Sequence, residues 1–308
     1  METGTKKTNI YIGALIVSIF LYFSFFPFSF IESLEKVIYE IEMRLDTPRN
    51  PEESRVSIVN IDDKSISTIG QWPWPRHIIA EMIMILKGNG AKLIGIDMLF
   101  SDKEQNPAIK EVKDLYNEIA KRNQGHAAGK TNEWILAKLK EIENRLDNDR
   151  TLLETVEKSG NIILPVVGTF GKYETELVLP PESFLNGKTI KKDRIANVDS
   201  LPVRDIRAPF PELSKSSRAL GHINFSPNEL MMGKAHIPFI NFRGHVISSL
   251  PLSLALYYLD KPPGEAIGKA RGLKLNEKLI PTSNGEILIK FRGSRRSFPT
   301  ILSLTSLT

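Results

Sequence analysis

The side chains best suited to chemistry occur in two short segments about twenty residues apart. The first segment reads DDKSISTIGQWPWPR and the second reads DMLFSD. A nucleophilic aspartate of the phosphatase type needs a D-x-D spacing, whereas the first segment has D-D-K, so the pattern favours ligand binding over catalysis. The candidate ligand-binding residues are Asp62, Asp63, Trp72, Trp74, Arg76, Asp97, Phe100 and Asp102.

Two predicted strands and one predicted helix position these residues. Residues 56–61 (VSIVNI) form a short β-branched run that predicts a strand, and residues 93–100 (LIGIDMLF) predict a central strand covered on both faces. Between them, residues 75–86 begin with a proline and are followed by Gly88 and Gly90, which is typical of a helix. This βαβ order would bring both segments to the carboxyl edge of one sheet, where open α/β sheets bind ligands.

A purely structural role for these residues is the competing interpretation. Asp62 and Asp97 can cap loop amides or pair with Arg76 without touching a ligand, and the residues alone favour this interpretation. Trp72 and Trp74 suit a core plug and an aromatic binding floor equally well, because tryptophan buries a large area while its N–H needs an acceptor.

The remaining pattern predicts an α/β fold with a mainly parallel or mixed sheet and helices on both faces. Residues 103–150 are highly charged with both signs mixed, and an apolar stripe within them predicts a helical insertion. Residues 161–167 (NIILPVV) predict a third buried strand. Further strands are expected at residues 219–225, 235–242 and 287–291, and helices at 152–158 and 250–259.

The N-terminal region predicts a membrane anchor. Residues 9–31 carry no charge over the length that a helix needs to cross about 30 Å of hydrocarbon. A cleaved signal peptide is the alternative, but its apolar core is shorter and ends in small residues. Lys6 and Lys7 precede the run, so residues 1–8 are expected in the cytoplasm and the rest of the chain outside.

Residues 32–50 link this anchor to an extracytoplasmic domain at residues 51–308. Apolar residues in 31–45 recur at helical spacing, and TPRNP at 47–51 reads as a hinge. The helical stripe fits homodimerisation and packing on its own domain equally well. The sequence ends at Ser306, Leu307 and Thr308 with no terminal core strand after the segment that begins at Pro299, so we expect an incomplete domain.

The sequence lacks the residues that several classes of enzyme and binding protein require. The chain has no cysteine, and its five histidines show no zinc-ligand spacing. GHAAGKT at residues 125–131 is one residue short of a P-loop, and no G-x-S-x-G element is present. The net charge of +5 is dispersed without stacking aromatics, which argues against nucleic acid. We therefore expect no enzyme, cofactor or metal.

The combined motifs resemble the second CHASE family of cyclase and histidine-kinase associated extracellular sensing domains. The resemblance rests on V-x-I-D-D-x-S at residues 59–65, W-P-W-P-R at 72–76 and G-A-K-x-[IV]-G-x-D-x-x-F-S at 90–101. It continues through 161–165, 208–225, 251–256 and 298–304. The sequence departs from the family at NELMMGK (228–234), which replaces its D-G-V-x-R turn, and in the long insertion at 103–150.

The resemblance implies a sensory input domain in the envelope. Such domains lie between one N-terminal membrane helix and three further helices, followed by a cytoplasmic cyclase, kinase or phosphodiesterase. The expected partners are the membrane and an unknown extracytoplasmic ligand or protein. The alternative is a non-catalytic scaffold module that uses the insertion at 103–150, and an enzyme ranks third.

Overall fold

The computed structural model describes the chain in two compact units. The described residues are 2–25, 41, 54–123, 130–171, 185, 188–191, 200–227, 233, 235–261, 272–275, 278–282, 285–289 and 300–301. One unit comprises Met1–Asn60 with Lys290–Ile301, and the other Ile61–Ile289 with Leu302–Thr308. The expected juxtamembrane helix at residues 31–45 lies outside the described residues except for Ile41, as does most of the turn at 228–234.

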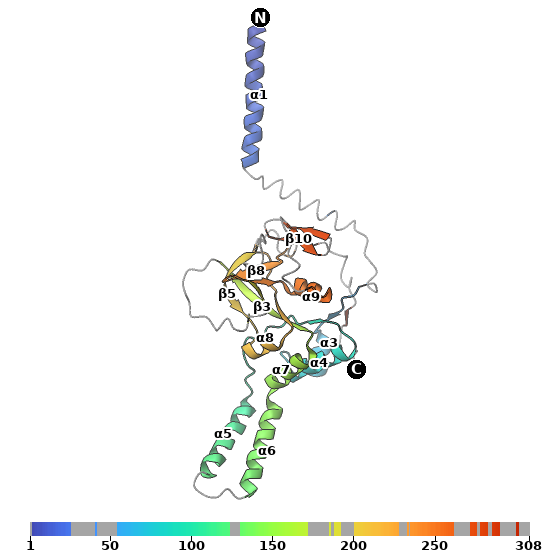
Figure 1. Ribbon diagram of the computed structural model, residues 1–308, viewed down its shortest axis with the longest axis vertical. Helices are drawn as coiled ribbons and strands as arrows, with labels where there is room; N and C mark the ends of the chain where they lie inside the picture. Colours follow the sequence, from blue (N-terminus) through green and yellow to red (C-terminus); the bar gives the residue numbers. More distant parts are fainter. Residues whose placement is uncertain are drawn as a thin grey trace. The chain divides into compact units, whose positions relative to one another are not determined.

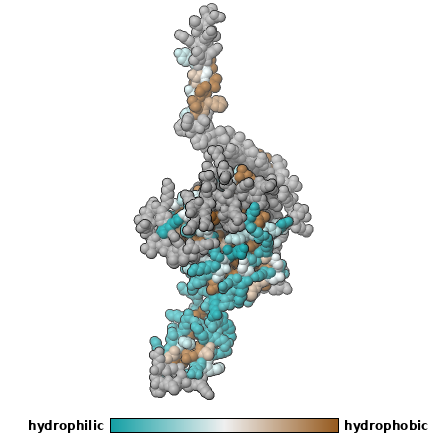
Figure 2. Space-filling view, in the orientation of Figure 1, coloured by the Kyte–Doolittle hydropathy of each residue, from teal (hydrophilic) through white to brown (hydrophobic). Residues whose placement is uncertain are grey.

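The first unit contains one long helix and a short strand pair. Helix α1 (Glu2–Phe25) presents exposed apolar side chains such as Leu15 and Phe20, seen as the brown band in Figure 2. Within the described part of the chain, no helix combines the length and apolar character required to cross a membrane. Strand β1 (Ile58–Val59) pairs in parallel with β13 (Thr300–Ile301), so the strand expected at 56–61 is present but short. Among the described strands this pair is a separate two-stranded sheet, so the expectation that residues 56–61 and 93–100 share one sheet as a βαβ unit is wrong.

A mixed sheet forms the centre of the second unit, as expected (Figure 1). Its strands follow the order β2-β3-β5-β8-β9-β4, and β6 also pairs with β3. The β2–β3, β3–β6 and β5–β8 pairs are parallel, whereas β3–β5, β8–β9 and β4–β9 are antiparallel. The strands are β2 (Ile94–Gly95), β3 (Ile162–Phe170), β4 (Ile190–Lys191), β5 (Leu201–Arg207), β6 (Ala219–His222), β8 (Phe239–Phe242) and β9 (His245–Ser248).

Two strand predictions need correction. The strand expected at 93–100 in the centre of the sheet is limited to β2, which lies at one end of the strand order of the described residues and pairs with β3. The strand expected at 235–242 is two strands, β7 (Ala235–His236) and β8, because Pro238 has no N–H for a ladder. Strand β7 pairs instead with β12 (Ile287–Leu288), and a separate ribbon joins β10 (Gly272–Leu275) to β11 (Lys278–Pro281).

Six helices of the second unit pack in three groups. Helix α4 (Arg76–Gly88) packs against α7 (Asn148–Ser159), and α7 in turn contacts α8 (Pro211–Ser216). Helix α9 (Leu250–Tyr258) lies against β6, β3 and β2. The insertion is a hairpin of α5 (Pro107–Asn123) and α6 (Lys130–Leu146), which confirms its helical character.

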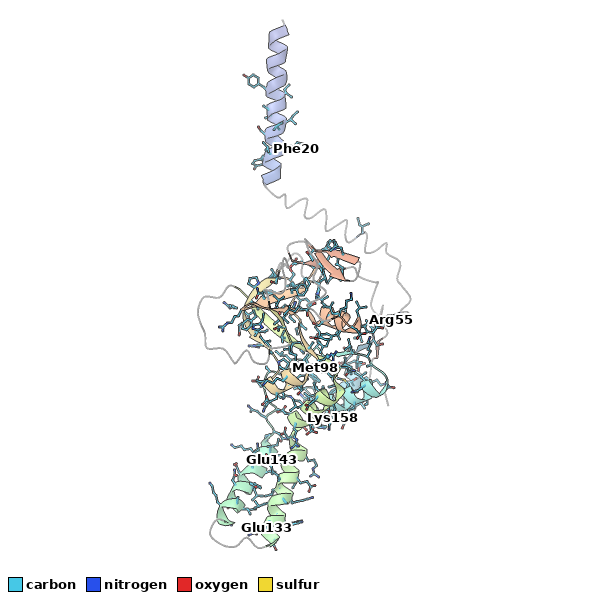
Figure 3. The ribbon with its side chains drawn as sticks, viewed as in Figure 1. Phe20, Arg55, Met98, Glu133, Glu143 and Lys158 are labelled. Atoms are coloured by element: carbon cyan, nitrogen blue, oxygen red, sulfur yellow. The ribbon has the colours of Figure 1, made fainter. Side chains whose placement is uncertain are left out.

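The hairpin is charged along its length. In α6, the Glu143 carboxylate forms two ion pairs. One oxygen lies 2.8 Å from Nζ of Lys140 in the same helix, and the other lies 3.5 Å from Nζ of Lys113 in α5. Figure 3 shows Glu133 and Glu143 near opposite ends of α6. Ion pairs with exposed lysines stabilise a surface helix only slightly, so the hairpin depends on apolar contacts such as those of the buried Leu139.

The segment after Ile61 is a short helix, α3 (Asp63–Ile69). Asp62 is its N-cap: one carboxylate oxygen accepts the backbone N–H of Ser65 at 2.9 Å and the Ser65 hydroxyl at 2.7 Å. An aspartate whose side chain satisfies a free N–H is a standard helix start. Asp62 thus has the capping role that the structural interpretation favoured.

Candidate functional site

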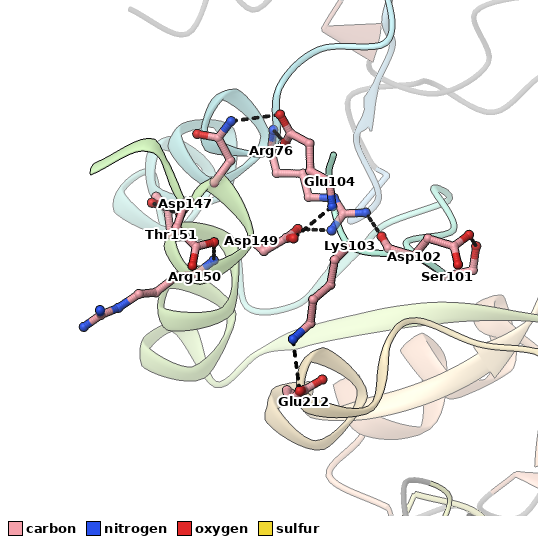
Figure 4. A network of polar contacts seen from close by, with 11 residues as sticks. Arg76, Ser101, Asp102, Lys103, Glu104, Asp147, Asp149, Arg150, Thr151 and Glu212 are labelled. Carbon is pink, nitrogen blue, oxygen red and sulfur yellow. Dashed lines mark hydrogen bonds and ion pairs between the residues drawn. The ribbon is translucent and has the colours of Figure 1, made fainter. Parts of the chain in front are cut away.

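Arg76 is the centre of a polar cluster at the start of α4. Its Nη1 contacts the Asp149 carboxylate, and its Nη2 contacts the backbone carbonyl of Asp102. The Arg76 and Asp149 side chains are only 13% and 12% exposed. Figure 4 shows α4, the start of α7 and the segment before α5 meeting here, so one guanidinium joins three parts of the chain.

Glu104 completes this network from the segment before α5. Its Oε2 accepts the backbone N–H of Arg76 at 3.1 Å, and its Oε1 accepts Nδ2 of Asn148 at 2.9 Å. The backbone N–H of Glu104 donates to Asp149 Oδ2 at 2.9 Å. We name Arg76, Asp102, Glu104, Asn148 and Asp149 the Arg76 cluster.

Aromatic rings flank the guanidinium. Its central carbon lies 5.6 Å from the centre of the Phe100 ring and 5.4 Å from that of Phe210. The backbone N–H of Phe210 donates to the carbonyl of Phe100 at 2.8 Å, which holds the two aromatic residues side by side. Arginine above aromatic faces is a favourable cation–π arrangement.

Burial and charge oppose each other at Arg76. Desolvation lowers the pKa of the guanidinium from its usual value, while the nearby charges of Glu104 and Asp102 raise it. Because arginine titrates far above neutrality, the side chain keeps its positive charge. The buried cation is therefore balanced by carboxylates and a carbonyl, as a stable buried charge requires.

A cavity of about 570 Å³ lies directly beside the Arg76 cluster. Glu104 and Asn148 belong both to the cluster and to the cavity wall, and His77 and Arg145 add groups that can carry positive charge. The His77 Nδ1 and Asn148 Oδ1 atoms are 3.0 Å apart, so a hydrogen bond joins these two side chains of the cavity wall. The full lining is Pro75, His77, Glu104, Gln105, Asn106, Pro107, Arg145, Leu146 and Asn148.

Three of the predicted site residues meet in this region. Arg76 and Phe100 are in direct contact. Asp102 contributes its carbonyl, while its carboxylate accepts the Ser101 hydroxyl at 3.0 Å.

The two tryptophans form a pair of their own. The Trp72 and Trp74 rings meet edge to face with centres 5.4 Å apart. Trp74 is buried and its Nε1 donates to the carbonyl of Gly70 at 2.7 Å, whereas Trp72 is 39% exposed. Trp74 therefore has the contacts of a core residue, and Trp72 alone offers a face to solvent.

The remaining predicted residues do not join the cluster. Asp62 caps α3, where its hydrogen bonds with Ser65 lower the pKa of its carboxyl group. Asp63 and Asp97 are exposed, and none of the described contacts links them to Arg76. The eight candidates are thus distributed over several places in the unit.

Sequence reasoning missed the partners of Arg76 that come from the insertion. Glu104, Asn148 and Asp149 lie at the two ends of a strongly charged segment, where one more carboxylate carries no signal. The run LDND at 146–149 does contain a capping pattern, and Asp147 caps α7 by accepting the Arg150 N–H at 3.0 Å. That signal marks the helix start, one residue from Asn148 and two from Asp149.

Comparison with known proteins identifies the family. Residues 13–308 match the CHASE2 domain, which covers nearly the whole chain. The chain belongs to the CHASE2 domain family. CHASE2 domains are extracellular sensory domains without a catalytic role. Comparisons with curated proteins and with solved structures gave no match.

Proposed function

We propose that this CHASE2 domain is the extracytoplasmic sensory input of a bacterial transmembrane receptor, which relays a stimulus to a cytoplasmic cyclase or kinase. The observation that carries the proposal is the cavity beside the Arg76 cluster. A solute bound there would touch Glu104 and Asn148, which are joined to Arg76 and through it to α4 and α7. Binding that favours one arrangement of these segments would shift the balance between two states.

The N-terminal segment is proposed to anchor the domain. The uncharged residues 9–31 follow Lys6 and Lys7, and apolar side chains such as Tyr11, Ile16 and Phe20 are exposed on α1. Apolar side chains exposed to this extent call for a covering environment. The segment at 32–50 would then transmit movement to the membrane, and pairing of two copies through it would make the receptor a homodimer.

A reporter fusion tests this topology. Alkaline phosphatase joined after Asn50 is expected to be active in intact bacteria, and green fluorescent protein joined at the same position is expected to stay dark. Exchanging Lys6 and Lys7 for glutamate should reduce the phosphatase signal, because positive residues hold the N-terminus inside. Bright fluorescence with inactive phosphatase would contradict the proposal, as would release of the domain with its N-terminus removed.

The cavity wall indicates a small hydrophilic solute with an anionic group. Arg145 and His77 can donate to an anion, while Glu104 and the amides of Asn106 and Asn148 suit hydroxyl or ammonium groups. Charge-assisted hydrogen bonds of this kind give orientation as well as affinity. The stimulus class we propose is therefore a small carboxylate, phosphate or amino acid.

A ligand screen on the full chain in detergent tests the cavity. A bound solute at about 100 times its dissociation constant stabilises the folded state by about 2.7 kcal/mol. Substitution Arg145→Ala should abolish the resulting rise in melting temperature. The matched control Arg122→Ala removes an exposed arginine that pairs with Glu118 far from the cavity, and should keep the rise. Equal responses in the two variants would show that binding occurs elsewhere.

The hairpin supports a second candidate function, that of an interaction module. Trp134 is 66% exposed and Leu115 is 47% exposed on the two helices. Large exposed apolar side chains often mark protein contacts. A receptor output lost in Trp134→Ala but retained in Arg145→Ala would favour a protein partner over a small solute.

A further inference from the structure

A buried polar cluster, separate from the Arg76 cluster, lies at the N-terminus of α9. His222 ends strand β6 and forms a backbone bridge with Ser249, which is the N-cap of α9. His236, in β7, places its Nε2 atom 2.6 Å from the Ser249 hydroxyl oxygen. His222 and Ser249 are fully buried. Two histidines thus converge on the residue that starts α9.

The hydrogen bonds around Ser249 fit a neutral His236. The Ser249 hydroxyl oxygen accepts the backbone N–H of Leu252 at 3.3 Å, which caps the helix. The hydroxyl proton is then available for the Nε2 atom of His236, and this nitrogen can accept it only when it carries no proton. A protonated His236 would instead donate to the second lone pair of the Ser249 oxygen, and the buried Ser249 hydroxyl proton would lose this acceptor.

His222 is also held in its neutral form. Its Nδ1 atom accepts the backbone N–H of Asn224 at 3.3 Å, which places the single ring proton on Nε2. Among the described residues, no acceptor lies within hydrogen-bonding geometry of this buried nitrogen. The nearby Pro238 carbonyl, which also accepts the Ser249 N–H at 2.9 Å, favours the protonated ring, but burial has the larger effect on the pKa of His222. A second proton on the His222 ring would therefore create a buried, weakly solvated cation.

Nearby charges do not offset this cost. Burial lowers the pKa of His222 to about 3, with a further contribution from His236, and burial also lowers the pKa of His236. Strand β3 carries no titratable side chain, His245 of β9 is bonded to Thr189, and the α9 tyrosines 257 and 258 lie at its far end. Glu286, adjacent to the β12 residue paired with His236, accepts the Ser226 hydroxyl.

We infer that His222, His236 and Ser249 form a proton-operated switch, in which proton uptake by the histidines uncaps α9 and releases it from β6. The inference rests on the proposed sensory function and adds external acidity as a stimulus. In the closed state Ser249 caps α9 and donates to neutral His236. In the open state each exposed ring binds one proton from the medium, and the positive charges no longer oppose the positive end of the α9 dipole.

The direction of the pH effect follows from the lowered pKa of each buried ring. An exposed histidine takes up its proton near pH 6.5, whereas buried His222 does so only near pH 3. The closed state is thus fully favoured above about pH 6.5, and its population decreases as the pH falls below this value. Below that pH, His222 shifts the equilibrium toward the open state by about tenfold per pH unit, and His236 acts in the same direction.

Hydrogen exchange of the full chain in detergent, followed by mass spectrometry, tests the switch. After correction for the intrinsic rate, protection of the α9 peptide is expected to fall at least about 30-fold between pH 7.5 and pH 5.0. In the double variant His222→Phe with His236→Gln, neither position can take a proton. The glutamine carbonyl can still accept from Ser249, so protection should become independent of pH.

His245→Gln is the matched control. His245 bonds to Thr189 and takes no part in the cluster, so this variant should keep the wild-type pH dependence. If the double variant does not fold, His236→Gln alone should reduce the slope by up to about tenfold per pH unit. Wild-type protection that is equal at both pH values would overturn the inference, as would an undiminished slope in the histidine variants. The measurement uses neither ligand nor output domain, so its failure leaves the cavity and topology tests intact.

Discussion

Replacing Arg76 with methionine is expected to lower the free energy of unfolding by about 3–5 kcal/mol. The substitution leaves the Asp149 carboxylate, which is 12% exposed, without its cation and removes a donor from the Asp102 carbonyl. Breaking one side of a buried ion pair is costly because the remaining charge has lost its solvation. Urea unfolding of the full chain in detergent, followed by tryptophan fluorescence, measures the change.

Two further variants distinguish the cost of the unpaired buried charge from a general loss of stability on substitution. The double variant Arg76→Met with Asp149→Leu should recover much of the loss, since an apolar pair can replace a buried ion pair. Lys92→Met breaks an exposed pair with Asp260, whose side chains are 52% and 84% exposed, and should cost less than about 1 kcal/mol. A change of below about 0.5 kcal/mol in Arg76→Met would show that the cluster does not hold α4 and α7 together.

The parts of the fold that the sequence predicts are those with an unambiguous local signal. The continuous apolar run at 161–167 becomes β3, which is buried along most of its length. The proline and glycines around 75–90 correctly bound α4. In both cases one physical requirement, either burial on two faces or the geometry of helix ends, determines the residues over the whole element.

Other elements carry weaker local signals. Strand β5 (LPVRDIR) spaces its buried Val203 and Ile206 three residues apart, because a bulge beside β3 interrupts the alternation. Helix α3 is only 7 residues long and has no apolar period, so its N-cap Asp62 was the single available sign. Short elements are defined by their partners in the folded structure.

The candidate site also contains contacts that the sequence predicts and contacts that it does not. The proximity of Arg76, Phe100 and Asp102 follows from strand and helix order near residues 75–102. Asp149 lies 73 residues after Arg76, and the α5–α6 hairpin brings it back. Residue spacing alone does not show that the first and last residues of a long insertion lie close together in the folded structure. The cluster at Ser249 is equally hidden, because its histidines come from β6 and β7.

Gly221→Val is expected to lower the free energy of unfolding by about 3 kcal/mol through a clash at the start of α9. A Cβ atom at Gly221 would lie 2.6 Å from the Cα atom and 2.8 Å from the backbone nitrogen of Leu250. Both are main-chain atoms, so α9 itself must move away from β6. The matched control is Gly88→Ala, where no atom lies within 4 Å and the change should be within about 1 kcal/mol of neutral.

The smaller variant Gly221→Ala connects this contact to the proposed switch. Its extra methyl group presses on the same Leu250 atoms, one residue after Ser249, and should favour the open state of α9 without any proton. Protection of the α9 peptide at pH 7.5 should then fall toward the wild-type value at pH 5.0. The circular dichroism spectrum should remain that of a folded chain. Wild-type protection of α9 in this variant would show that α9 leaves the sheet by another route, without opening at Gly221.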